Sequence, residues 1–244
     1  GLSATPRRKD GADPVIWYHL GKILYSAKKD TLKPRLRRIF TGWLLPPVMR
    51  KNPIKMPTIL RLMCANDGRN GQIAEQIVAA VRSGSRRKVM VLSDRVKHLV
   101  RLENRIKGLV GDEDVSVDYY VGALEEEVEV EVEDKRTGKK RKKKKVRKKR
   151  RTMDELKQAE RAQVIMATYQ MAQEALDIPA LDTVMLVTPR VDVEQAVGRI
   201  RRLCRPEPGK CEHYCPWRAG DCPGKPEPVI VTDFIDEESE CVDR

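Results

Sequence analysis

The sequence predicts an α/β fold in which helices cover both faces of a parallel sheet. Segments of helical spacing alternate with short segments that are apolar almost throughout, as strands are when both faces of a sheet are covered. The strand-like segments are residues 88–94, 115–122, 163–168, 183–189 and 228–236. Sheets of this kind bind ligands at the carboxyl ends of their strands, so we expect a site at that edge.

The predicted helices carry apolar residues at every third or fourth position. In residues 71–84 these are Ile73, Ile77, Val78 and Val81, and a Ser-Gly pair ends the pattern. In residues 95–110 they are Val96, Leu99, Val100, Leu102 and Ile106. Shorter helices are predicted at 153–162 and 192–203.

The N-terminal part of the sequence is less regular. Residues 1–11, GLSATPRRKDG, read as the end of a buried strand, so we expect further sequence in front of them. Residues 30–58 are rich in proline and arginine, which predicts irregular connecting structure.

Positive charge is concentrated in one segment. The chain of 244 residues has a net charge of +13, and residues 135–151 hold 14 of its 49 lysines and arginines. Residues 125–134 hold 7 of its 36 acids, which leaves +6 for the rest of the chain. A mildly basic body suits a partner that carries phosphate, such as nucleic acid. No apolar run reaches the roughly 18 residues of a membrane span, and no leader is visible, so we expect an intracellular protein without membrane contact.

The charged insertion, residues 125–151, allows two structures. Glu-Val alternation, then Thr-Gly, then the lysine run would form a ribbon with an acidic strand facing a basic one. Disorder is the alternative, because the basic leg has one apolar residue, Val146. The run could contact nucleic acid, serve as a nuclear address, or be a solvated insertion.

A stripe of polar residues marks the helix predicted at 192–203. Gln195, Arg199 and Arg202 stand at i, i+4 and i+7, and Asp192 is placed to cap the helix. Guanidinium groups pair with phosphate oxygens in bidentate fashion, so the stripe suits a polyphosphate. A solvated basic face is the alternative.

Four of the six cysteines fall within nineteen residues, at Cys204, Cys211, Cys215 and Cys222. The cluster predicts a zinc site, with His213 as an alternate ligand. An iron–sulfur cluster or free thiols are the alternatives, because no C-x-x-C pair is present.

Four segments together resemble motifs III to VI of superfamily 2 helicases, in order and spacing. They are GLSATPRRKDG, VMVLSDR, VIMATYQMAQEALDIPALDTVMLVTP and DVEQAVGRIRR. The third and fourth are similar to DEAD/DEAH-type helicases of phages and large DNA viruses. One departure is Ala175, where the family has glycine.

The resemblance implies a RecA-like fold and a division of the chain. Residues 1–30 would end a first RecA-like domain, 31–68 would connect the domains, and 69–244 would form the second helicase domain. The second domain would include the charged insertion and the Cys-rich segment 204–222. The sequence contains no G-x-x-x-x-G-K-[ST], so the first domain would supply the Walker motifs and most of the magnesium site, and this chain alone would be inactive.

The resemblance also implies residue roles in an ATP-dependent helicase or translocase. Arg199 and Arg202 would reach the γ-phosphate, with Arg199 as the arginine finger, and Gln195 would help sense the nucleotide. Residues for ATP binding and coupling would be Asp177, Gly198, Ser3 and Thr5. Residues for nucleic-acid binding, with DNA expected rather than RNA, would be Ser93, Arg95 and Thr168. A viral replication site or the nucleus would suit this activity. The alternative is a non-catalytic nucleic-acid-binding module on a degenerate RecA fold.

Overall fold

The computed structural model describes residues 11–25, 32–46, 55–83, 87–133, 140–174, 178–201 and 228–236. The chain divides into two compact units, Gly1–Thr31 and Leu32–Arg244. In the first unit, helix α1 (Asp13–Leu20) begins with a proline in its first turn and ends at Gly21, whose φ of 78° favours glycine. None of its residues is buried.

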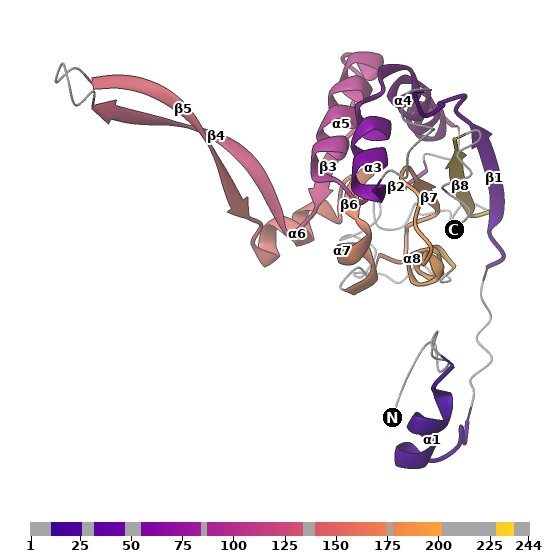
Figure 1. Ribbon diagram of the computed structural model, residues 1–244. Coiled ribbons are helices and arrows are strands. Elements are labelled where there is room, and N and C mark those ends of the chain that lie inside the picture. The colour runs from indigo at the N-terminus through magenta and orange to yellow at the C-terminus, as the bar shows by residue number, and fades with distance from the viewer. Residues whose placement is uncertain are drawn as a thin grey trace, which may run out of the picture. The chain divides into compact units, whose positions relative to one another are not determined.

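The second unit contains a six-stranded parallel sheet, which confirms the predicted fold class (Figure 1). The strand order is β1-β8-β7-β2-β6-β3. The strands are β1 (Arg35–Phe40), β2 (Val89–Ser93), β3 (Val117–Tyr120), β6 (Val164–Thr168), β7 (Thr183–Leu186) and β8 (Ile230–Ile235). Strand β2 is buried along its whole length, as its continuous apolar sequence predicts.

Helices cover both faces of this sheet. Helices α4 (Asp67–Arg82) and α5 (Val96–Val110) pack on Val89 and Val91 of β2. Helices α6 (Met153–Ala159), α7 (Tyr169–Glu174) and α8 (Glu194–Ile200) pack in the cluster that contains Met90 and Leu92. Alternate strand residues therefore serve opposite faces. A further helix, α3 (Met56–Ala65), contacts α4. None of the helices in the described part of the chain combines the length and apolarity needed to cross a membrane.

The connections that leave the neighbouring strands β2 and β7 run in opposite directions along the sheet. The connection through α5 leads from β2 outward to β3, whereas those through α6, α7 and α8 lead back across the sheet to β8. Right-handed crossovers in opposite directions place their helices on opposite faces, as observed. Parallel sheets open a crevice where the direction changes, at the carboxyl ends of the strands. The fold therefore places a candidate site where β2, β6 and β7 end.

Three elements differ from the sequence-based expectation. Strand β1 lies inside residues 30–58, which were expected to be irregular, and it pairs with β8. Most of its residues are exposed, so it lacks the apolar run of a buried strand. Helix α7 is too short to show a helical period. Helix α4 begins earlier than expected, because Asn66 caps it by accepting a hydrogen bond from the Arg69 amide (2.8 Å).

The charged insertion forms a ribbon, which decides between the two structures allowed by the sequence. Strands β4 (Ala123–Glu133) and β5 (Lys140–Arg150) pair antiparallel as a separate two-stranded sheet (Figure 1). The Arg151 amide donates to the Gly122 carbonyl oxygen (3.1 Å) and closes the base of the ribbon.

Candidate functional site

The candidate site is the sheet edge at which β2, β6 and β7 end. Ser93 and Thr168 are register partners at the last positions of β2 and β6. The Val187 amide donates to the Leu92 carbonyl oxygen (3.0 Å), which continues the pairing of β2 beyond β7. The strands of the segments that resemble helicase motifs IV and V, β2 and β6, therefore end side by side.

The first residues after these strands are joined by hydrogen bonds. The Asp94 amide donates to Thr188 Oγ1 (3.0 Å), and Arg190 donates to Asp94 Oδ1 (3.1 Å). The Arg190 guanidinium also lies 5.8 Å from the ring centre of Tyr169, within range of a cation–π contact. The Tyr169 hydroxyl donates to the Thr188 carbonyl oxygen (2.6 Å). These contacts fix the loops after β2 and β7 and the start of α7 relative to one another.

A series of buried hydrogen bonds holds the loop after β2 in place. Asn70 Nδ2 donates to the Cys64 carbonyl oxygen (3.1 Å), so Asn70 Oδ1 accepts from His98 Nε2 (2.9 Å). His98 Nδ1 then accepts from the Ser93 hydroxyl (3.0 Å), whose oxygen accepts from the Arg95 amide (3.2 Å). The tautomer of the neutral ring follows from this direction of donation.

The Ser93 hydroxyl uses its hydrogen in the bond to His98 and accepts from the Arg95 amide, so both of its bonds belong to this hydrogen-bond network. Serine paired with histidine also occurs in hydrolases, where the nucleophile must reach a substrate. Here Ser93, His98 and Asn70 are all buried, so the arrangement positions the backbone at Arg95 and is not a nucleophilic site. Arg95 is exposed and Thr168 is half-buried, so these two residues are the accessible members of the predicted nucleic-acid set.

Acid is expected to destabilise the protein through His98. Burial, together with the positive charges of Arg69 and Arg101, lowers the pKa of His98 from 6.5 to about 3. Between these values the unfolded chain binds a proton that the folded chain does not, so stability falls as pH falls through this window. Urea unfolding at pH 5 should give a free energy about 2 kcal/mol lower than at pH 7 through this residue. His98→Gln should flatten the dependence, and an unchanged dependence would contradict the assignment.

Helix α8 carries the arginine stripe, and its start differs from the prediction. The helix begins at Glu194, its N-cap is Val193, and no side chain caps it, so Asp192 does not act as the cap. Instead, the Asp192 carbonyl oxygen accepts from Gln173 Nε2 (3.1 Å), which joins the end of α7 to the entry of α8. The Val193 carbonyl oxygen accepts from the Val197 amide (2.8 Å), and this first intrahelical hydrogen bond makes Val193 the N-cap.

Two predicted site residues of α8 are described with their surroundings. Gln195 is exposed. At Gly198 an added Cβ would meet no heavy atom within 4 Å in the described part of the chain, and its φ is not positive. Neither backbone conformation nor packing among those residues therefore requires glycine there. The backbone of Arg199 lies in α8, but its side chain is not described.

The remaining predicted site residues lie outside the described residues, and their roles stay predictions. They are Ser3, Thr5, Asp177, Arg202, Cys204, Cys211, His213, Cys215 and Cys222. Within the described ranges, no three His, Cys, Asp or Glu residues are grouped so that they could hold a metal ion. The predicted zinc ligands all lie outside those ranges, so the zinc site stays a prediction. Cys64 is a free, buried thiol, and burial raises its pKa from 9.0 to about 11, so it is not a reactive nucleophile.

Comparison with known proteins supports the motif assignment. No protein-family model matches the chain. A "putative ATP-dependent RNA helicase L396" of Acanthamoeba polyphaga mimivirus is 25% identical over 217 residues, which cover 83% of this chain and 35% of that protein. The chain resembles superfamily 2 helicases of large DNA viruses. The resemblance expected from the four motifs is therefore confirmed.

One solved structure of similar fold agrees with the architecture. A fragment of a putative HsdR subunit of a type I restriction enzyme from Vibrio vulnificus YJ016 has a TM-score of 0.56 at 15% identity, covering 96% of this chain and 39% of that one. UvsW of T4 has a TM-score of 0.46 at 17% identity, covering 84% of this chain and 33% of that one. The HsdR fragment shows the similarity of fold alone. The chain spans between 33% and 39% of the length of these three proteins.

Several residues at this edge were not predicted as site residues. Tyr169 follows β6 directly, and Thr188 and Arg190 lie two and four residues after the end of β7. Their place just beyond the carboxyl ends of strands is the signal that could have identified them. His98 and Asn70 lie inside helices at separate places in the sequence, and only the folded chain brings them together.

Proposed function

We propose that this chain provides the second RecA-like domain of an ATP-dependent helicase or translocase acting on nucleic acid. One observation carries the proposal: the segments that resemble motifs IV, V and VI meet at the sheet edge where β2, β6 and β7 end. Ser93 pairs with Thr168, Arg190 bonds Asp94, and Gln173 bonds Asp192. The viral relative, whose name specifies an ATP-dependent RNA helicase, supports the activity. No observation favours the non-catalytic module.

The proposal assigns the nucleotide to helix α8, whose residues 194–200 include Gln195, Gly198 and Arg199. Phosphoryl transfer needs a phosphate cradle, magnesium and a cation that neutralises developing charge. Arg199 would supply that cation with Arg202 beside it, Gln195 would sense the nucleotide, and Gly198 would leave room for it. Asp177, Ser3 and Thr5 would couple nucleotide binding to domain movement. A first RecA-like domain would hold most of the magnesium site, and residues 1–30 and 31–68 would be its end and the connection.

The proposal assigns nucleic acid to the loops after β2 and β6. Arg95 is exposed at the N-terminus of α5, and the buried chain through Ser93 fixes its backbone. Arg95 would pair with a phosphate, and Thr168 would hold the backbone by its hydroxyl or amide, a contact that does not read sequence. The Ser93 hydroxyl would act only by positioning Arg95. The partner is RNA or DNA, and a viral replication site suits the relative's source.

An arginine substitution tests the nucleic-acid half of this proposal. Arg95→Gln should weaken binding of oligonucleotides severalfold at low salt and lower the salt slope by roughly one, because one phosphate contact is lost. Lys107→Gln is the matched control, since it removes the same charge from an exposed residue in the last turn of α5. Fluorescence anisotropy over a salt series measures both. Equal effects of the two variants would contradict the assignment.

A further inference from the structure

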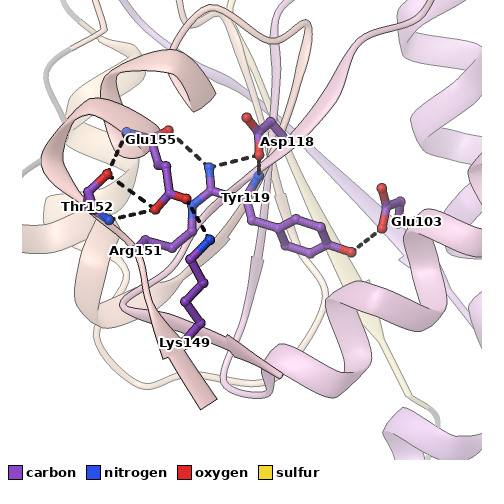
Figure 2. Close-up of polar contacts among 7 residues, drawn as sticks. All are labelled: Glu103, Asp118, Tyr119, Lys149, Arg151, Thr152 and Glu155. Atoms are coloured by element: carbon purple, nitrogen blue, oxygen red, sulfur yellow. Dashed lines mark hydrogen bonds and ion pairs between the residues drawn. The ribbon is translucent and has the colours of Figure 1, made fainter. Parts of the chain in front are cut away.

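The β4–β5 ribbon is firmly anchored on its basic leg (Figure 2). Arg151 donates to Asp118 Oδ1 and to the Glu155 carbonyl oxygen, both at 3.0 Å. Thr152 and Glu155 form a capping box that starts α6, with the Thr152 amide 2.7 Å from Glu155 Oε2. Lys149 Nζ lies 3.4 Å from Glu155 Oε1. The end of β5 is therefore tied to β3 and α6 at once.

The acidic leg is anchored beside the candidate site. Lys97 in the first turn of α5 pairs with Glu125 (3.2 Å), and Leu124 packs against the core under α4 and α5. The Tyr119 hydroxyl donates to the Glu103 carboxylate, which joins β3 to α5 (Figure 2). Lys97 is two residues from Arg95, so the ribbon starts at the same edge of the sheet as the proposed nucleic-acid contacts.

The register of the ribbon sorts its residues onto two faces. In an antiparallel pair, directly opposed residues share a face and successive residues alternate. Along β5, one face, here called the basic face, has Arg141, Lys143, Lys145, Arg147 and Lys149. The residues opposite them on β4 are Val132, Val130, Val128, Glu126 and Leu124.

The other face, here called the mixed face, has acids and bases in equal number. Its acids are Glu125, Glu127, Glu129, Glu131 and Glu133. Its bases are Lys140, Lys142, Lys144, Lys148 and Arg150. Four of the five acids stand directly opposite a lysine, the exception being Glu127, which is opposite Val146. The mixed face is therefore neutral in sum, whereas the basic face has five cations against one anion.

We infer that the basic face of the ribbon binds the phosphate backbone of nucleic acid, extending the track proposed at the sheet edge. This inference rests on the proposed function. We assign the contact to the basic face because the mixed face is neutral in sum. An insertion that is merely solvated has no need to concentrate its net positive charge on one face. A two-stranded ribbon is of a size that enters the major groove of a duplex. On the basic face the apolar residues belong to β4 and all five cations to β5, so the cations form a single row that would meet phosphate.

The spacing of the basic row fits a nucleic-acid strand. Every second residue of a strand repeats at about 6.8 Å, and two nucleotides along one strand of duplex DNA rise by about 6.8 Å. Eleven paired positions give the ribbon a length of roughly 35 Å, or about ten base pairs. The row is therefore long enough to neutralise several phosphates.

Two variants of equal charge test the inference on the 244-residue chain. The basic-face variant is Lys143→Thr, Lys145→Thr and Arg147→Thr, and the mixed-face variant is Lys142→Thr, Lys144→Thr and Lys148→Thr. Binding of a duplex and of a single strand of about 20 nucleotides is measured by anisotropy over a salt series. We expect the basic-face variant to weaken duplex binding about tenfold or more and to lower the salt slope by about 2 to 3. The mixed-face variant should stay within about threefold of the wild type, since each of its three lysines is the register partner of a glutamate.

Each other result overturns the inference in a recognisable way. Equal weakening by both variants would mean that net charge alone attracts nucleic acid to the ribbon. Unchanged binding by both, with Arg95→Gln still weakening it, would remove the ribbon from the track and leave the proposed function standing. No effect of any of the three would count against the proposed function as well. Circular dichroism melting of each variant separates loss of contact from loss of fold, and a larger effect on single strand than on duplex would exclude groove insertion.

Discussion

Replacing Arg199 by alanine, in a protein that carries both RecA-like domains, is expected to lower nucleic-acid-stimulated ATP hydrolysis by about 10³-fold or more. A cation at the transferring phosphoryl group stabilises charge that develops only in the transition state, so its loss affects turnover more than binding. Phosphate release measured at saturating nucleic acid gives the rate, and anisotropy shows whether nucleic-acid binding is retained.

The same helix offers a control for this experiment. Arg201 follows two residues later, is exposed, and donates to the Leu32 carbonyl oxygen (3.4 Å). Arg201→Ala removes an equal charge and should leave hydrolysis near the wild-type rate. Unchanged hydrolysis in Arg199→Ala would instead make the α8 stripe a contact to the nucleic-acid backbone.

The second large effect is expected from a buried ion pair at the end of β8. Arg69 Nε lies 2.7 Å from Asp236 Oδ1, and their side chains are 0% and 6% exposed. The Thr41 hydroxyl donates to the same carboxylate oxygen. Removing one partner of a buried pair leaves an uncompensated charge, which costs about 3 to 5 kcal/mol. Asp236→Ala should lower the free energy of unfolding by that amount, measured by chemical denaturation.

The buried surroundings of Arg69 make this effect larger than that of an exposed ion pair. Arg69 Nη1 and Nη2 are buried without a hydrogen-bond partner among the residues described, so Asp236 is the main compensation for the guanidinium. The exposed pair Arg82–Glu113, with side chains 48% and 46% exposed, is the contrast. Glu113→Ala should cost no more than about 1 kcal/mol, as exposed pairs do. Similar costs for both acids would show that water reaches Arg69.

The sequence predicts the inner strands well because burial on both faces leaves an apolar run. Strands β2, β6 and β7 are such runs, and each is observed within its predicted segment. Strand β1 could not be found this way, since an edge strand pairs through its backbone and exposes its side chains. The periodicity of α5 is likewise confirmed at Leu99, whereas Val100 is exposed.

The location of the candidate site could be predicted from the sequence, but the hydrogen bonds between its residues could not. The resemblance assigned Ser93 and Thr168 to one set of nucleic-acid-binding residues, and in the structure the two are register partners. The role of Ser93 could not be read in the same way, because its hydroxyl is taken up by His98, which a helix carries to it. A side chain named by position in a motif is therefore not always the one that faces solvent.

Strand β1 also determines how the sheet comes apart. Five of its six residues are exposed and the sixth is half-buried, so backbone pairing with β8 on one side holds it in place. Amide protons of β1 should accordingly exchange with solvent by local opening, ahead of those in β2, which lies between two strands and is buried throughout. The edge strand β1 is thus the part of the sheet that opens first. The central strand β2, whose last residue Ser93 lies at the candidate site, should exchange slowly.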